Sequence, residues 1–299
     1  MTAEIVIINQ HGVAMAADSA VTIGNQKIIN SAIKLFSLSK TEPVGIMIYG
    51  NANLLNIPWE TLIKIYRKEH NNKLDNLNQY GENFINFLKA KLPLFNGEQQ
   101  VSWALERIEN LFNDIIENIR IELQKLQLSG TKINEDQIFR TAESLISEYN
   151  NALITNELVY DDQLSESSTK SLEFLINEKI NEIFPHFRDN KNICNLLIEI
   201  GKSAVFRCID INASGIVISG FGENDIFPSV ITYDIHGVYD NKLLFRINKD
   251  KTIINSNVAN MKSAIIPFAQ EDVVRSFLEG IHPELFEYSM NYTNEILQA

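Results

Sequence analysis

The first fifty residues constrain the fold of this chain more than any other stretch. Short apolar runs at residues 4–9 and 13–17 flank a turn signal at 10–12, and the β-branched stretch 21–33 contains a second turn at Gly24-Asn25. Two more short strands, 34–39 and 44–49, flank Thr41-Glu42-Pro43. Strands joined by turns this short pair antiparallel. We therefore expect the chain to begin as an antiparallel sheet.

Thr2 stands directly behind the initiator methionine, and removal of Met1 would leave it with a free α-amine. Such a residue can act as nucleophile and base together, because the amine, with an ordinary pKa of about 7.7 to 8.0, can take the hydroxyl proton. Lys34 would favour the alkoxide, and Asp18 would orient the ammonium. The sequence thus predicts a catalytic set of Thr2, Asp18 and Lys34.

The spacing of these residues, sixteen positions at each step within GVAMAADSAVT and KLF, resembles that of proteasome β-subunits and bacterial relatives such as HslV. The resemblance covers residues 2–60. It implies an N-terminal nucleophile (Ntn) hydrolase: an α+β, four-layer αββα sandwich of two antiparallel sheets, with Thr2 attacking peptide amide bonds. It also implies a homo-oligomer of rings or stacked rings enclosing a chamber, and an ATP-dependent unfoldase as a partner.

A fourth site residue follows from the resemblance. In the family a backbone N–H at the end of the strand before the first helix serves as an oxyanion donor, and Gly50 in YGNAN is the candidate here. It lies slightly later than an ungapped alignment from Thr2 and Lys34 places it. The chain also departs from the family at Phe268-Ala269-Gln270, where active relatives have a turn rich in glycine and serine, and the family's last strands have no counterpart before Ala299.

Each site residue also has a plain structural interpretation. Thr2 belongs to a chain terminus, and termini are often disordered. An aspartate after a strand, such as Asp18, commonly stabilises a turn, and a lone lysine such as Lys34 is commonly a solvated charge. Only their joint spacing favours catalysis.

Helices are predicted from residue 57 onward, and the family resemblance stops from residue 97 to about residue 187. We expect helices at 57–67 and 80–92, one long helix at 100–128, and further helices at 135–153, 171–184 and 191–203, with a loop at 161–170. The long helix and its successor fit either a short coiled-coil hairpin or plain amphipathic packing. Strands are expected at 205–211, 216–220, 242–248 and 253–256, with a strand, turn and helix at the end. The domain prediction is residues 1–96 and 188–299 for the Ntn domain and 97–187 for a helical insertion, a candidate lid or docking arm.

Composition excludes several classes of function. The formal net charge of −12 disfavours nucleic acid and anionic membranes as partners. Cys194 and Cys208 have no CxxC spacing, no histidine lies at ligand spacing, and GFGE lacks the GK[ST] of a phosphate loop, so no metal or cofactor is expected. No apolar run reaches the length of a signal peptide core or a membrane span. We expect a cytoplasmic protein with free thiols.

Three functions are compatible with these features. The leading one is a threonine-type peptidase within a self-compartmentalised oligomer. A catalytically inactive ring or filament scaffold is favoured by Ala269-Gln270 and opposed by Thr2, Asp18 and Lys34. An Ntn hydrolase of small amides would use the same nucleophile.

Overall fold

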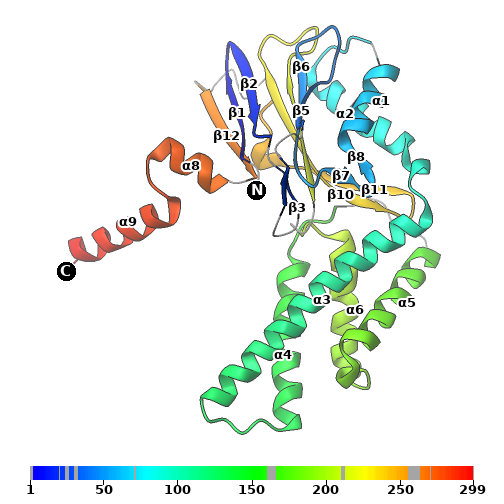
Figure 1. The fold of residues 1–299 in the computed structure, drawn as a ribbon, viewed down its shortest axis with the longest axis vertical. Helices are drawn as coiled ribbons and strands as arrows, with labels where there is room; N and C mark the ends of the chain where they lie inside the picture. The colour runs from blue at the N-terminus through cyan, green and yellow to red at the C-terminus, as the bar shows by residue number, and fades with distance from the viewer. Residues whose placement is uncertain are drawn as a thin grey trace. The chain divides into compact units, whose positions relative to one another are not determined.

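The computed structural model of the protein describes residues 3–19, 21–23, 27–29, 33–70, 72–159, 166–209, 213–254, 263–269 and 271–298 (Figure 1). The chain combines helices with antiparallel sheets, as expected for an α+β protein. It divides into two compact units. Unit 1 comprises Met1–Ala90, Ser214–Ile235 and Ile247–Ala299, and unit 2 comprises Lys91–Ala213 and His236–Arg246. The predicted insertion, residues 97–187, lies within unit 2.

The first sheet of unit 1 joins the two ends of the sequence. Its order is β12-β1-β2, and both pairings are antiparallel. The hairpin of β1 and β2 confirms the turn expected at residues 10–12, where the Asn9 side chain accepts hydrogen bonds from the N–H groups of His11 and Gly12. The strands are β1 (Ala3–Asn9), β2 (Gly12–Ala17) and β12 (Ser263–Ala269).

The second sheet has the order β11-β10-β9-β6-β5. Its β9 is buried at every residue, because it lies between β6 and β10 in the interior of the sheet. Strands β9 and β10 pair antiparallel, and β9 contains the strand expected at 216–220. Its strands are β5 (Leu35–Ser37), β6 (Val44–Gly50), β9 (Ser214–Gly220), β10 (Ser229–Tyr239) and β11 (Lys242–Ile247).

Two small hairpins complete the strands that the structure describes. One joins β3 (Val21–Ile23) to β4 (Lys27–Ile29), which confirms the second hairpin expected near the N-terminus. The other joins β7 (Asn53–Leu54) to β8 (Ile57–Pro58) and leads directly into the first helix.

The two larger sheets share an apolar core. Val6, Ile8, Ile266 and Phe268 from the first sheet pack with side chains of the second, among them Met47. Every one of these five side chains is at most 8% exposed. Burial on this scale stabilises a fold by roughly 1.5–3 kcal/mol per large apolar side chain. The facing sheets are thus held together by their inward residues.

Helices cover both sheets of unit 1 (Figure 1). Helix α2 packs on β9 with α1 beside it, whereas α8 packs on β1 and β12. In α1 the buried residues Trp59, Leu62, Ile63 and Tyr66 recur at spacings of three and four, as the sequence predicted. The helices are α1 (Trp59–Glu69), α2 (Leu77–Ala90), α8 (Glu271–Glu279) and α9 (Pro283–Gln298).

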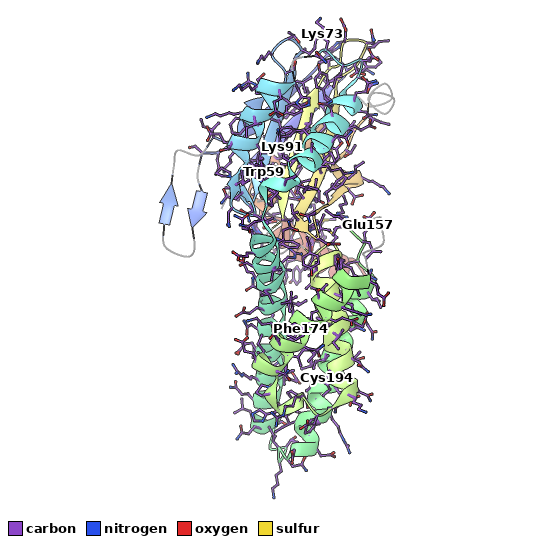
Figure 2. The ribbon with its side chains drawn as sticks, turned by 90° about the vertical axis from the view of Figure 1, so that its right-hand side faces the viewer. Trp59, Lys73, Lys91, Glu157, Phe174 and Cys194 are labelled. Atoms are coloured by element: carbon purple, nitrogen blue, oxygen red, sulfur yellow. The ribbon has the colours of Figure 1, made fainter. Side chains whose placement is uncertain are left out.

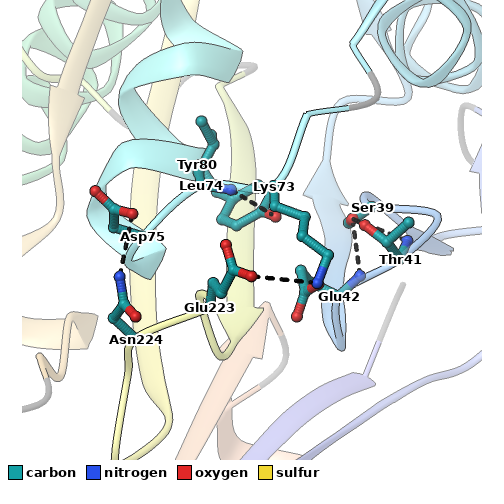
Figure 3. A network of polar contacts seen from close by, with 9 residues as sticks. All are labelled: Ser39, Thr41, Glu42, Lys73, Leu74, Asp75, Tyr80, Glu223 and Asn224. Atoms are coloured by element: carbon teal, nitrogen blue, oxygen red, sulfur yellow. Dashed lines mark hydrogen bonds and ion pairs between the residues drawn. The ribbon is translucent and has the colours of Figure 1, made fainter.

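Polar contacts tie three connections of unit 1 together (Figure 3). Lys73 Nζ lies 2.9 Å from Glu42 Oε1 and 3.4 Å from Glu223 Oε1, which links the β5–β6 turn, the segment before α2 and the β9–β10 connection. Asn224 donates to Asp75 beside them, at 3.1 Å. These contacts fix the loops at one end of the second sheet.

Unit 2 is built mainly from four helices around one core (Figure 2). Phe112, Ile146, Ile176 and Leu197, one from each helix, are completely buried in it. Phe174 and Cys194 lie on two of these helices, outside that core's fully buried part. Because all four helices share the core, the packing is broader than a two-helix coiled-coil hairpin. The helices are α3 (Gly97–Leu128), α4 (Glu135–Ile154), α5 (Glu166–Ile183) and α6 (Lys191–Phe206).

Helix α3 is a single uninterrupted helix, as predicted. Asn96 caps it: the Asn96 side chain accepts the Gln99 N–H at 2.8 Å, and the Gln99 side chain accepts the Asn96 N–H at 3.1 Å. Gly130, with φ +85°, follows its C-terminal end. The helix therefore has defined caps at both ends.

Several predicted boundaries were wrong. Residues 205 and 206 continue α6 instead of starting a strand, because Ile193, Leu197, Ile200 and Ala204 maintain a buried helical face to its end. A short apolar run does not distinguish a strand from a helix end.

Other boundaries also differ. Helix α2 begins at Leu77, earlier than expected, because Asp225 accepts the Leu77 N–H at 2.8 Å. Residues 166–170 of the expected loop belong to α5, whereas 161–165 lie outside the described residues. Ile253 forms an isolated bridge to Val230, and residues 255 and 256 of the strand expected at 253–256 lie outside the described residues.

Candidate active site

Asp18 and Lys34, predicted from their spacing, lie together in unit 1. Asp18 follows the end of β2, and Lys34 immediately precedes β5. Lys34 Nζ donates to Asp18 Oδ1 at 2.5 Å, and the Lys34 side chain is only 9% exposed while that of Asp18 is 36% exposed. Lys34 is therefore not a solvated surface charge. It is a largely buried cation held by a carboxylate.

Thr2, the predicted nucleophile, lies outside the residues that the structure describes. Its neighbour in the chain, Ala3, begins β1, and the Ala3 carbonyl accepts the Asp18 N–H at 3.1 Å. The sequence therefore places Thr2 one residue before a backbone contact made by Asp18 itself. The start of β1 therefore lies beside the Lys34–Asp18 pair.

Glu4 adds a carboxylate that the sequence reasoning missed. Its Oε1 lies 3.6 Å from Lys34 Nζ, and the residue is 1% exposed. Neither carboxylate oxygen has a hydrogen-bond partner among the described residues. A buried charge without hydrogen bonds is unfavourable. Lys34 is thus the cation that Glu4 and Asp18 both face.

The environment of Glu4 raises the pKa of its carboxyl group toward neutral pH. Burial raises the pKa of Glu4 to about 7; the Lys34 ammonium opposes this shift, and Asp18 adds to it. A sequence signal for Glu4 existed. In β1 the buried positions alternate as Glu4, Val6 and Ile8, so a charged residue occupies a core-facing position of the strand.

Gly50, the candidate oxyanion donor, ends β6 close to the backbone of Lys34. The Lys34 carbonyl accepts the Ile48 N–H at 2.9 Å, which places Gly50 two residues further along the neighbouring strand. Gly50 has a φ of +76°, a conformation that suits glycine, and it pairs with Ser214. The structure thus brings the strand end carrying Gly50 to the segment carrying Lys34.

The turn after Gly50 is held by buried hydrogen bonds. Trp59, labelled in Figure 2, donates its indole N–H to Ser214 Oγ at 2.9 Å. Ser214 Oγ donates in turn to the Asn51 carbonyl at 3.0 Å. Ser214 is 2% exposed, so its hydroxyl is shielded from water, and its bond to the Asn51 carbonyl holds the turn that follows Gly50.

The departure from the family at Phe268-Ala269 falls beside the start of β1. Ala269 is paired with Ala3 in the first sheet, and its φ of +55° is unusual for a residue other than glycine. Gln270 lies outside the described residues. Ala269 brings no hydroxyl to this end of the sheet, whereas the resemblance leads us to expect a serine in the turn.

A second group of polar side chains lies near Glu4. The Tyr49 hydroxyl donates to Asp234 at 3.3 Å, and Lys251 Nζ lies 2.5 Å from Glu271 Oε1 and 5.1 Å from the centre of the Phe268 ring. Burial, followed by the charges of Asp234 and Glu4, raises the pKa of Tyr49. The Tyr49 hydroxyl is therefore uncharged and lies near the carboxyl groups of Asp234 and Glu4.

The other candidate His, Cys, Asp and Glu side chains of the described residues do not come together as a site. In the described ranges, no three His, Cys, Asp or Glu side chains are arranged to hold a metal ion. Cys194 and Cys208 are free thiols. His236, in unit 2, is 3% exposed, and burial followed by the charges of Arg107 and Arg246 lowers its pKa to about 3. Among the helices that the structure describes, none is long and apolar enough to cross a membrane.

Comparison with protein-family models gives no match, and comparison with curated proteins also gives none.

Proposed function

We propose that the protein is an N-terminal nucleophile hydrolase of the proteasome-like type, which cleaves peptide amide bonds with Thr2. The observation that carries the proposal is the largely buried Lys34 ammonium, held 2.5 Å from Asp18, whose own N–H bonds to Ala3. A sequence spacing alone suggested this pair. Its closeness to the residue after Thr2 supports a shared chemical role.

In the proposed reaction, the free α-amine of Thr2 accepts the hydroxyl proton as the oxygen attacks the substrate carbonyl. Lys34 stabilises the developing negative charge on the attacking oxygen, and Asp18 orients Lys34. The amine then returns the proton to the leaving amine, and water hydrolyses the resulting ester. The Gly50 N–H is the proposed donor to the oxyanion.

The layers of unit 1 support the αββα sandwich as the finer fold assignment. Helices α1 and α2 lie on one side of the second sheet, the sheets share a core, and α8 lies on the first sheet. Assembly as a homo-oligomer and delivery of substrate by an ATP-dependent unfoldase are parts of the same proposal. The charge of −12 makes nucleic acid an unfavourable partner for it.

The test combines intact mass and N-terminal sequencing with hydrolysis of fluorogenic peptides. We expect a mature chain that starts at Thr2, loss of all hydrolysis in Thr2→Ala, and a loss of about 10²–10³-fold in Lys34→Met. Lys64→Met is the matched control, because Lys64 pairs with Glu60 on the exposed face of α1. Full activity in Thr2→Ala, or in a chain that retains Met1, would contradict the assignment of the nucleophile.

A second candidate is a scaffold that has the fold but not the activity. One observation favours it: Ala269 lies opposite Ala3, so this position of the first sheet provides no hydroxyl to support a nucleophile. Assembly of the purified protein into rings or filaments with no hydrolysis of any peptide would favour the scaffold. Hydrolysis restricted to small amides would instead identify an amidohydrolase.

A further inference from the structure

Lys34 faces two carboxylates, and the two differ in their surroundings. Asp18 accepts a hydrogen bond from Lys34 at 2.5 Å and is partly exposed. Glu4 lies 3.6 Å from the same nitrogen, is 1% exposed, and has no hydrogen-bond donor among the described residues. Asp18 is therefore the closer partner of Lys34, and Glu4 lies 1.1 Å further from the same nitrogen.

The charge on Glu4 determines the net charge of the cluster. With Glu4 protonated, the Lys34 and Asp18 charges cancel. With Glu4 ionised, the three side chains carry a net charge of −1 in a low-dielectric interior, where charges interact strongly. A negative charge that develops on an oxygen beside Lys34 is stabilised in the first state and repelled in the second.

Few other titratable groups face Glu4. Within β1, β2 and β12 Glu4 is the sole titratable residue, and Asp18 directly follows β2. Strand β6 contributes Tyr49, whose pKa is raised by burial first and then by surrounding charges that include Glu4. Helix α8, which packs on β1, carries Glu271, Asp272, Arg275 and Glu279, and its Glu271 is paired with Lys251.

We infer that Glu4 is a charge regulator of Lys34: its protonated form leaves the ammonium available to the reacting oxygen, and its ionised form suppresses hydrolysis. The inference rests on the proposed function, because Glu4 regulates no reaction if no oxygen reacts beside Lys34. Glu4 touches no substrate in this scheme and acts through Lys34, so it is a positioning residue. Burial raises the pKa of Glu4 to about 7, so the change of state falls within the physiological range.

The experiment measures kcat/KM for a fluorogenic peptide from pH 5.5 to 9 in the mature protein and in Glu4→Gln. We expect the ratio of variant to parent to be near one at pH 5.5 and to rise through pH 7 to roughly tenfold at pH 9. Both proteins carry the Thr2 amine, so the difference between their pH profiles reports the removal of the Glu4 charge. Glu60→Gln makes the same charge change on the surface of α1 and should give a flat ratio.

Glu4→Met, which is also unable to ionise, provides a second test if Glu4→Gln does not fold. A ratio that does not vary with pH overturns the inference and leaves the proposed function intact. Absence of hydrolysis by the mature parent protein overturns both. Carbon-13 NMR of the glutamate carboxyl groups tests directly whether Glu4 titrates. We expect a resonance that titrates near pH 7 and is missing from Glu4→Gln.

Discussion

At the scale of single residues, the unusual feature of unit 1 is a glutamate in a core position. Glu4 occupies an inward site of β1 beside the apolar residues Val6 and Ile8. An ionised carboxylate there lacks the hydrogen bonds that water would give it, and one cation at 3.6 Å is its nearest compensation. Such a group makes stability depend on pH.

The sign of this dependence follows from proton binding. The pKa of Glu4 is raised from its ordinary 4.5 to about 7, so between these values the folded chain binds more protons than the unfolded chain. Protonated Glu4 therefore makes its full contribution to the free energy of unfolding below pH 4.5, and this contribution is lost as the pH rises through 7. We expect Glu4→Gln to be more stable than the parent at pH 8, by up to about 3 kcal/mol, and equal to it near pH 4.5.

Urea unfolding of both proteins at several pH values, followed by Trp59 fluorescence in a Trp103→Phe background, measures this difference within unit 1. Equal stabilities of Glu4→Gln and its parent at pH 8 would show that folding does not raise the pKa of Glu4.

At the scale of elements, the end of β6 depends on a buried serine of β9. Ser214 accepts a hydrogen bond from the Trp59 indole and donates one to the Asn51 carbonyl, on either side of the turn that follows Gly50. The helix start and the strand end are thus joined through one hydroxyl group.

We expect Ser214→Ala to destabilise unit 1 by about 1–3 kcal/mol, because the buried indole N–H loses its acceptor. Under the proposed function, Ser214→Ala also lowers kcat, because the Asn51 carbonyl in the turn after Gly50 loses its hydrogen bond. Ser219→Ala is the matched control. Ser219 lies on the same strand at 1% exposure, and its hydroxyl has no partner in the described part of the chain, so its removal should be nearly neutral. Equal losses in the two variants, measured by urea unfolding, would refute the role of Ser214.

The sequence predicted most elements but few of their contacts. Periodicity identified α1, α3 and α4, and short apolar or β-branched runs split by turn signals identified the hairpins, because both patterns are local. The pairing of Ala3 with Ala269 and the approach of Glu4 to Lys34 depend on residues far apart in the chain. Asp18 and Lys34 were predicted together only through a family spacing, whereas Glu4, which is absent from that pattern, was overlooked despite its inward position.

At the scale of the whole molecule, apolar side chains of the last two helices are exposed. On α8 Phe277 is 88% exposed and Leu278 is 48% exposed, and on α9 Leu285 and Tyr288 are 57% and 70% exposed. Clusters of exposed apolar residues commonly mark interaction surfaces. This is compatible with the proposed homo-oligomer.

We expect Phe277→Ser to shift the protein toward smaller species while leaving the stability of the fold within about 0.5 kcal/mol, since the side chain makes few contacts within the chain. Phe174→Ser is the control: Phe174 is 63% exposed on α5 in unit 2. Sedimentation velocity at several protein concentrations measures the assembly. Identical distributions for Phe277→Ser and the parent would remove this helix from the interface.

The pairing of β1 with β12 also determines when the candidate site can form during translation. Strand β1 leaves the ribosome long before its partner β12, which lies roughly 250 residues later in the sequence. At about 5–20 residues per second, β1 waits roughly tens of seconds with one edge unpaired. During that interval β2 is its only sheet neighbour among the described strands. A nascent chain that stops short of β12 therefore carries Glu4, Asp18 and Lys34 without the strand that completes the first sheet.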